Sequence, residues 1–146
     1  MLMTGSPTID AQRAFTRAER RRRRAAIARR LRRRPSDAGH LAVVDEGGVR
    51  ARGGDARPGI REIPLNAIHA TTEPSRAALF DASFRPSRKA RERWERLWLA
   101  EQRGATLPPI SVVRVGDAYA VRDGHHRVSV AQARGAVAID ATVEAA

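Results

Sequence analysis

The chain has 146 residues, no cysteine and a formal net charge of +12 at pH 7. This length suits one domain with appendages, and the lack of cysteine excludes a disulfide framework, a thiolate metal site and a cysteine nucleophile. No stretch approaches the roughly 18 consecutive apolar residues of a membrane span, and no apolar signal region follows the N-terminus. We therefore expect a cytoplasmic protein with no membrane partner.

Residues 1–36 are expected to be a basic extension. They hold twelve arginines and two acidic residues, a net charge of +10, which leaves +2 for the other 110 residues. Between about residues 9 and 34 the sequence avoids Gly and Pro and is rich in Ala and Arg, which favours a helix. Its large apolar residues are Phe15, Ile27 and Leu31. This stripe is too narrow to fasten the helix into a core, so we expect a helical or disordered extension.

The arginines of this extension predict a surface for DNA or RNA. Cationic side chains that release counterions from a phosphate backbone supply an affinity that has no sequence preference and falls with salt. Such binding would place the protein at the nucleoid. The alternative is that the arginines are exposed to solvent and bind no ligand. A transit peptide fits five consecutive arginines poorly. The predicted nucleic-acid-binding residues are Arg20, Arg21, Arg22, Arg23, Arg24, Arg29, Arg30, Arg32, Arg33 and Arg34.

Residues 37–59 contain two Gly-Gly pairs and a Pro-Gly pair, which predict a linker or an exposed hairpin, and residues 60–146 are expected to form the compact domain. Alternating apolar patterns and breakers predict its elements. In chain order they are a strand at 60–63, a turn or short helix at 65–68, a wrapping segment at 71–86, a helix at 87–103, strands at 110–115 and 119–122, a helix from 123 or 124 to 134, and a strand at 138–143. The fold is therefore α+β or α/β, a small mixed sheet packed with helices.

The helix at 87–103 is expected to begin at Ser87 as its cap. Ala90, Trp94, Leu97 and Trp98 follow at the spacing i, i+4, i+7 and i+8, which places them on one face. We interpret the two tryptophans as core residues. Stacking of nucleic-acid bases on them is the alternative.

The stretch from Arg122 to Ala131 joins a strand to a helix through small and polar residues, and it predicts a phosphate-binding corner. Asp123 would cap the helix by accepting backbone N–H groups, and Gly124 would let a ligand approach the backbone. Free N–H groups at a helix start attract anions, and Arg127 would add a forked donor. A capped helix with a turn glycine is the plain alternative.

His125 and His126 stand in the same corner and would donate or transfer a proton near neutral pH. Adjacent residues of a helix diverge by about 100°, so both imidazoles cannot readily face one metal ion. Asp123 with His126 could face one metal ion, but two ligands are too few for a typical site, so we predict no metal site.

The order of these parts resembles the ParB/sulfiredoxin-like superfamily, and specifically the N-terminal domain of ParB partition proteins. The likeness covers about residues 60–143. The stretches that carry it are Ile63–Ile68, which is similar to the opening of that domain, Gly104–Arg114, similar to its first box, Val115–Tyr119, similar to its connecting hairpin, and Asp123–Ala131, similar to its second box.

In that superfamily the second box and its helix start bind nucleotide phosphates, those of CTP in partition clamps and those of ATP in sulfiredoxins and a free-serine kinase branch. The resemblance therefore implies a nucleotide site with CTP or ATP, and Mg, as its cofactors. Gly124 and Arg127 match the Gly and Arg of the box, and His126 stands where sulfiredoxins also have His. His125 replaces their catalytic cysteine, so sulfinic-acid reduction by that mechanism is excluded. The implied nucleotide-binding residues are Asp123, Gly124, His125, His126 and Arg127.

The resulting prediction is a bacterial ParB-like protein that binds a nucleotide, associates with nucleic acid and is linked to chromosome partitioning. The sequence leaves open whether it hydrolyses the nucleotide and whether it forms a homodimer. Because the chain ends at Ala146 without a helix-turn-helix or a dimerisation domain, a complete partition clamp is not expected. The alternatives are a small-molecule phosphotransferase of the free-serine-kinase type, with His125 or Asp123 as the catalytic candidate, and a ParB-like nuclease.

Overall fold

The computed structural model describes residues 5–32, 39–45 and 59–144 of the chain. The helices and strands of these residues are α1 (Pro7–Arg32), β1 (Ala42–Val43), β2 (Ile60–Pro64), β3 (Ile68–Thr71), α3 (Arg91–Gln102), β4 (Ile110–Val115), β5 (Ala118–Asp123), α4 (His125–Ala133) and β6 (Ala138–Glu144). Short 3-10 helices lie at Leu65–Ala67, Pro74–Leu79 and Arg88–Ala90. The predicted elements of the compact domain are all present, within a few residues of their expected bounds.

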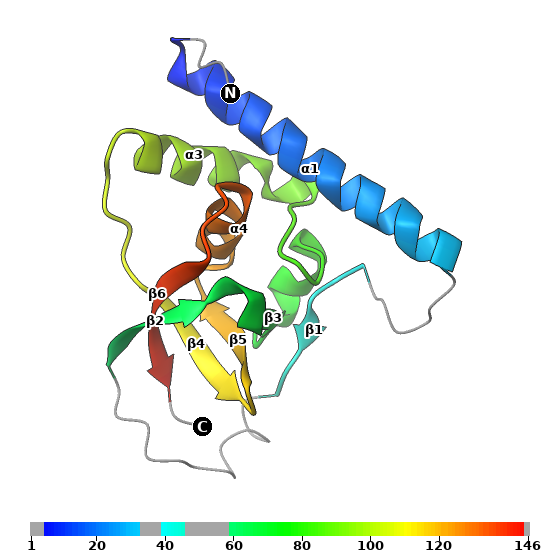
Figure 1. The fold of residues 1–146 in the computed structure, drawn as a ribbon, viewed down its shortest axis with the longest axis vertical. Coiled ribbons are helices and arrows are strands. Elements are labelled where there is room, and N and C mark those ends of the chain that lie inside the picture. The colour runs from blue at the N-terminus through cyan, green and yellow to red at the C-terminus, as the bar shows by residue number, and fades with distance from the viewer. Residues whose placement is uncertain (1–4, 33–38, 46–58, 145–146) are drawn as a thin grey trace.

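The strands form one mixed sheet in the order β1-β3-β5-β4-β6-β2, and Figure 1 shows α4 next to this sheet, with α3 and then α1 beyond it. β4 and β5 are an antiparallel hairpin, whereas β3 and β5 are parallel neighbours. The carboxyl ends of β3 and β5 therefore meet at the same edge of the sheet, and α4 begins directly after β5 at that edge. This mixed sheet with helices confirms the predicted α+β fold.

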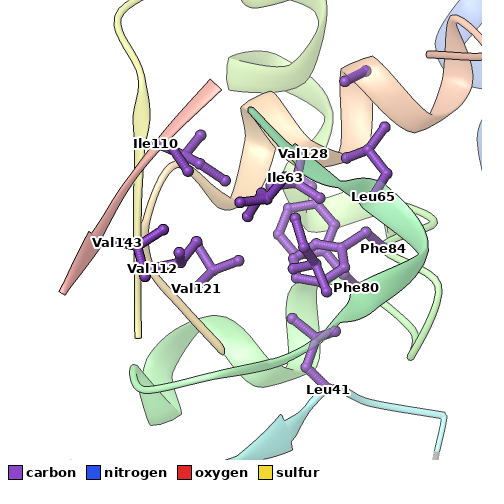
Figure 2. Close-up of a cluster of buried hydrophobic side chains, with 14 residues drawn as sticks. Leu41, Ile63, Leu65, Phe80, Phe84, Ile110, Val112, Val121, Val128 and Val143 are labelled. Atoms are coloured by element: carbon purple, nitrogen blue, oxygen red, sulfur yellow. The ribbon is translucent and has the colours of Figure 1, made fainter. Parts of the chain in front are cut away.

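One cluster of buried apolar side chains fills the space between the sheet and α4. Figure 2 shows that Ile110, Val121 and Ile63 from three strands gather with Val128 of α4. Phe80, and Phe84 beside it, come from the segment between β3 and α3 and belong to the same cluster. The expectation that residues 71–86 wrap around the core is confirmed.

A second cluster joins α1 to α3 and α4, and it corrects the expectation for the N-terminal helix. Figure 1 shows α1 lying across α3. The Phe15 side chain is 0% exposed, and its ring meets the Trp94 ring edge-on, with 5.5 Å between the centroids. The apolar face of α1 is wide enough to pack here because the small alanines beside Phe15 allow close contact between the helices. Further along α1, Ile27 and Leu31 are 58% and 80% exposed, so only the N-terminal half packs as core.

The helix that carries the tryptophans begins differently from the prediction. A 3-10 turn at Arg88–Ala90 precedes α3, and Ser87 makes no side-chain capping bond. The assignment of both tryptophans to the core is confirmed, since Trp94 and Trp98 are buried. The Trp94 indole N–H donates to the Ser129 hydroxyl at 2.9 Å, which joins α3 to α4.

Part of the predicted linker, residues 46–58, lies outside the described residues, as do Arg33 and Arg34. The described part of residues 37–59 includes β1, which pairs with β3 in parallel. None of the helices in the described ranges combines the length and the apolar character needed to cross a membrane. The domain boundaries drawn from the sequence stay predictions.

Candidate functional site

The corner between β5 and α4 has a glycine, and not the predicted aspartate, at its helix cap. Gly124 is the N-cap of α4 with φ 108°, and no side chain caps the helix. The Asp123 carboxylate instead accepts a hydrogen bond from Arg127 Nη2 at 3.1 Å. The predicted capping role of Asp123 is therefore wrong, and the first turn of α4 keeps its backbone N–H groups free of side-chain caps.

Gly124 is required by close packing as well as by its left-handed backbone. A Cβ added at this position would lie 2.4 Å from Ile110 Cγ2. The space that a ligand was predicted to occupy beside Gly124 is therefore filled, where a Cβ would stand, by the side chain of Ile110. Substitution of Gly124 would disturb the fold before it could disturb a ligand.

Arg127 joins the start of α4 to the segment that leads into β4. Its Nη1 donates to the carbonyl oxygens of Pro108 at 2.7 Å and Pro109 at 3.0 Å, while Nη2 is bound to Asp123. The Arg127 side chain is only 14% exposed. Most of the donors expected to form a phosphate fork are thus already used within the fold.

His125 is a buried imidazole tied to the end of β3. Its Nε2 lies 2.6 Å from Thr71 Oγ1, and the same hydroxyl oxygen accepts the Glu73 N–H at 2.9 Å. Burial, helped by the charge of Arg76 and opposed by that of Asp123, lowers the pKa of His125 to about 4. The ring is therefore neutral at neutral pH, and its part in proton transfer stays a prediction.

His126 is also buried but lacks a hydrogen-bond partner among the described residues. Its side chain packs edge-on against the Phe80 ring, with 5.2 Å between the centroids. Burial lowers the pKa of His126 to about 4, with smaller contributions from the charges of Arg93 and Arg76. His126 is therefore a neutral imidazole whose nitrogens are available for a ligand.

A cavity of about 330 Å³ lies over this corner, and all five predicted site residues line it. Arg76, from the 3-10 helix after β3, and Arg93, from α3, add two guanidinium groups. Neither of these two side chains has an ion-pair or hydrogen-bond partner among the described residues, whereas Arg122 at the same cavity pairs with Glu144. The corner thus joins an uncapped helix start to two cationic groups that are not neutralised.

Sequence reasoning missed Arg76, Arg93 and Thr71 as members of this site. Thr71 ends one strand and Asp123 ends its parallel neighbour, so their meeting depends on strand pairing. Arg93 precedes the buried Trp94 on the helix, and its exposed character alone does not distinguish it from other arginines. The local sequence signal for this part of the site was the polar Thr71 at the end of a strand, with Pro74 three residues later.

The arginines predicted to bind nucleic acid divide into several groups on α1. Arg23 pairs with Glu19 at 2.8 Å, and Arg29 lies 4.0 Å from the buried Asp81 carboxylate. Arg22 is partly buried. The four that are exposed and unpaired within the described ranges are Arg20, Arg21, Arg24 and Arg30. Among the predicted nucleic-acid-binding residues whose side chains the structure describes, these four carry the charge that is free for a ligand.

The chain is similar to the crystal structure of sulfiredoxin from Arabidopsis thaliana, with a TM-score of 0.44 and 22% sequence identity over 61% of this chain and 88% of that chain. No family model matches the chain, and no curated protein does either.

Proposed function

We propose that the cavity between β5 and α4 binds the phosphate groups of a nucleotide. The observation that carries this proposal is the uncapped first turn of α4, which shares the cavity with the unpaired Arg76 and Arg93. Backbone N–H groups and the helix dipole attract anions at such a helix start. Two guanidinium groups without carboxylate partners add charge-assisted donors for phosphate oxygens.

The other groups at the cavity suit CTP or ATP with Mg. The volume of about 330 Å³ falls in the usual range for small-molecule sites. His126 presents an unpaired neutral imidazole that can donate one hydrogen bond. The carboxylates of Glu73 and Asp123 also line the cavity, which suits a Mg²⁺ ion held mainly through phosphate oxygens and water.

Calorimetric titration of the full chain with CTP, ATP and GTP, with and without Mg, tests the proposal. We expect binding by at least one of them, and we expect Arg93→Ala to weaken it about tenfold because a charge-assisted contact is lost. Arg103→Ala is the matched control, since it removes an exposed arginine just beyond α3 that does not line the cavity. Equal affinities for the parent and both variants would contradict this assignment of the site.

We also propose that α1 gives the protein a nonspecific affinity for DNA or RNA, as a nucleoid-associated protein linked to chromosome partitioning would need. The exposed arginines of α1 support this, because each can neutralise a backbone phosphate and release a counterion. Mobility shifts at increasing salt check it. The affinity should fall steeply with salt, and an affinity independent of salt would remove the counterion argument.

His126 favours a second candidate, a phosphotransferase of the free-serine-kinase type. A neutral imidazole without a partner can accept a proton from a hydroxyl group held in the cavity. Release of ADP or CDP that depends on a hydroxylated acceptor would identify this activity. Nucleotide binding without such release would favour the binding protein.

A further inference from the structure

A second cavity, of about 210 Å³, lies where α1 meets α3 and α4. Arg17 and Arg21 from α1 line it, together with Trp98 from α3 and Arg134 just after α4. The remaining lining residues are alanines, so three arginines and no acidic side chain face this space. We name it the α1 groove. It is separate from the cavity at the start of α4, with which it shares no lining residue.

Arg134 is held in a fixed position at the α1 groove. Its Nη2 donates to the Trp98 carbonyl oxygen at 2.8 Å, and its Nε lies 2.8 Å from Glu101 Oε2. The guanidinium carbon lies 4.6 Å from the centroid of the Trp98 ring. These contacts orient the group before any ligand arrives, which lowers the entropy lost on binding.

The arginines from α1 are also presented by a docked helix. Phe15 anchors the N-terminal half against Trp94, and Arg29 lies 4.0 Å from the buried Asp81 carboxylate toward the other end. Arg17 and Arg21 are one turn apart and therefore lie on the same side of the helix. Arg21 has no ion-pair or hydrogen-bond partner among the residues that the structure describes. Its charge is available to an anion.

We propose that the α1 groove seats a phosphate of a nucleic-acid backbone and so sets where the strand crosses the protein. This rests on the proposed association of α1 with nucleic acid, and it names the site of that association. Exposed Arg20 and Arg24, which do not line the groove, continue the positive charge along the same helix. A backbone with repeated phosphates can use this extended surface, whereas a single free phosphate can use only the groove.

Fluorescence anisotropy of the full chain with a labelled 20-base-pair DNA duplex, and with an RNA duplex of the same sequence, tests this proposal. We expect Arg21→Ala to weaken binding at least about fivefold more than Arg24→Ala, because only Arg21 lines the groove. Both substitutions remove one charge from an exposed position of α1, so the difference between them isolates the groove. Arg21 and Arg24 are both exposed, so both variants should stay folded.

The indole N–H resonance of Trp98 gives a local readout. It should shift when duplex is added to the parent or to Arg24→Ala, and it should shift much less for Arg21→Ala. Equal losses of affinity in both variants, with an unchanged Trp98 resonance, would overturn the groove while leaving nucleic-acid binding by α1 in place. No binding by the parent at low salt would overturn both proposals. A Trp98 shift with millimolar inorganic phosphate but not with either duplex would assign the groove to a free anion and overturn the backbone proposal.

Discussion

Gly124 is the residue on which the geometry of the corner depends most directly. Gly124→Ala should cost about 3 kcal/mol, since it adds overpacking against Ile110 to the strain of a left-handed backbone. Gly116→Ala is the control, because its φ of 62° is also left-handed but its Cβ would meet nothing within 4 Å. It should cost only about 1 kcal/mol. Urea denaturation measures both, and equal costs would show that Ile110 yields without penalty.

Arg127 illustrates how a residue suited to phosphate can serve the fold. The sequence predicts that Arg127 adds a forked donor for phosphate, a role in which its loss would weaken nucleotide binding and leave stability almost unchanged. Because its guanidinium bridges Pro108, Pro109 and Asp123, we now expect the substitution to lower the free energy of unfolding by about 2 kcal/mol. Chemical denaturation decides between the two. An unchanged midpoint and slope would favour the predicted role of Arg127 as a phosphate donor.

The two buried histidines predict a pH dependence of stability. Their folded pKa values of about 4 lie below the ordinary histidine value of 6.5, so the unfolded chain binds more protons between these pH values. The free energy of unfolding should therefore fall as the pH drops from about 6.5 to about 4, and this contribution should be constant above pH 6.5. His126→Gln should reduce the slope, measured by urea denaturation across this range. His69→Gln, at an exposed position, should retain the slope of the parent.

At the scale of elements, one part of α1 packs in the core and another part carries exposed positive charge. Phe15→Ala should lower the free energy of unfolding by about 3–5 kcal/mol, the usual cost of truncating a buried aromatic side chain. Ile27→Ala removes an apolar side chain from the same helix at a position that is 58% exposed. It should change stability by less than about 0.5 kcal/mol. Thermal and chemical unfolding of the two variants check this, and similar values would mean that α1 is an undocked extension.

At the scale of the whole molecule, α1 covers apolar side chains of α3 and α4. Deleting residues 1–36 would uncover Trp94, Trp98 and Val130, which share a cluster with Phe15. The shortened chain should bind the dye ANS and unfold with less cooperativity, because it exposes a contiguous apolar patch. Deleting residues 1–6, which precede α1, is the control. A shortened chain with parental cooperativity and no dye binding would restore the separate extension expected from the sequence.

Local sequence patterns were sufficient to predict most helices and strands and the position of the proposed phosphate-binding corner. Alternation of apolar residues identified β4 and β5, and the spacing of Trp94 and Trp98 identified the buried face of α3, because these periodicities follow from backbone geometry alone. The five residues of the corner are adjacent in the chain, so their joint position needed no knowledge of the fold. The sequence thus determined where a helix start, a glycine and an arginine would meet.

The partners of these residues depend on contacts between distant segments, which only the tertiary structure decided. His125 meets Thr71 because β3 and β5 pair in parallel, and Arg127 meets Pro108 because β4 lies beside the start of α4. Phe15 is buried because α3 offers it a surface, although the Phe15 segment alone has too few apolar residues to predict this. Side-chain partners and burial are set by segments that pack across long sequence separations, and a local pattern carries no information about them.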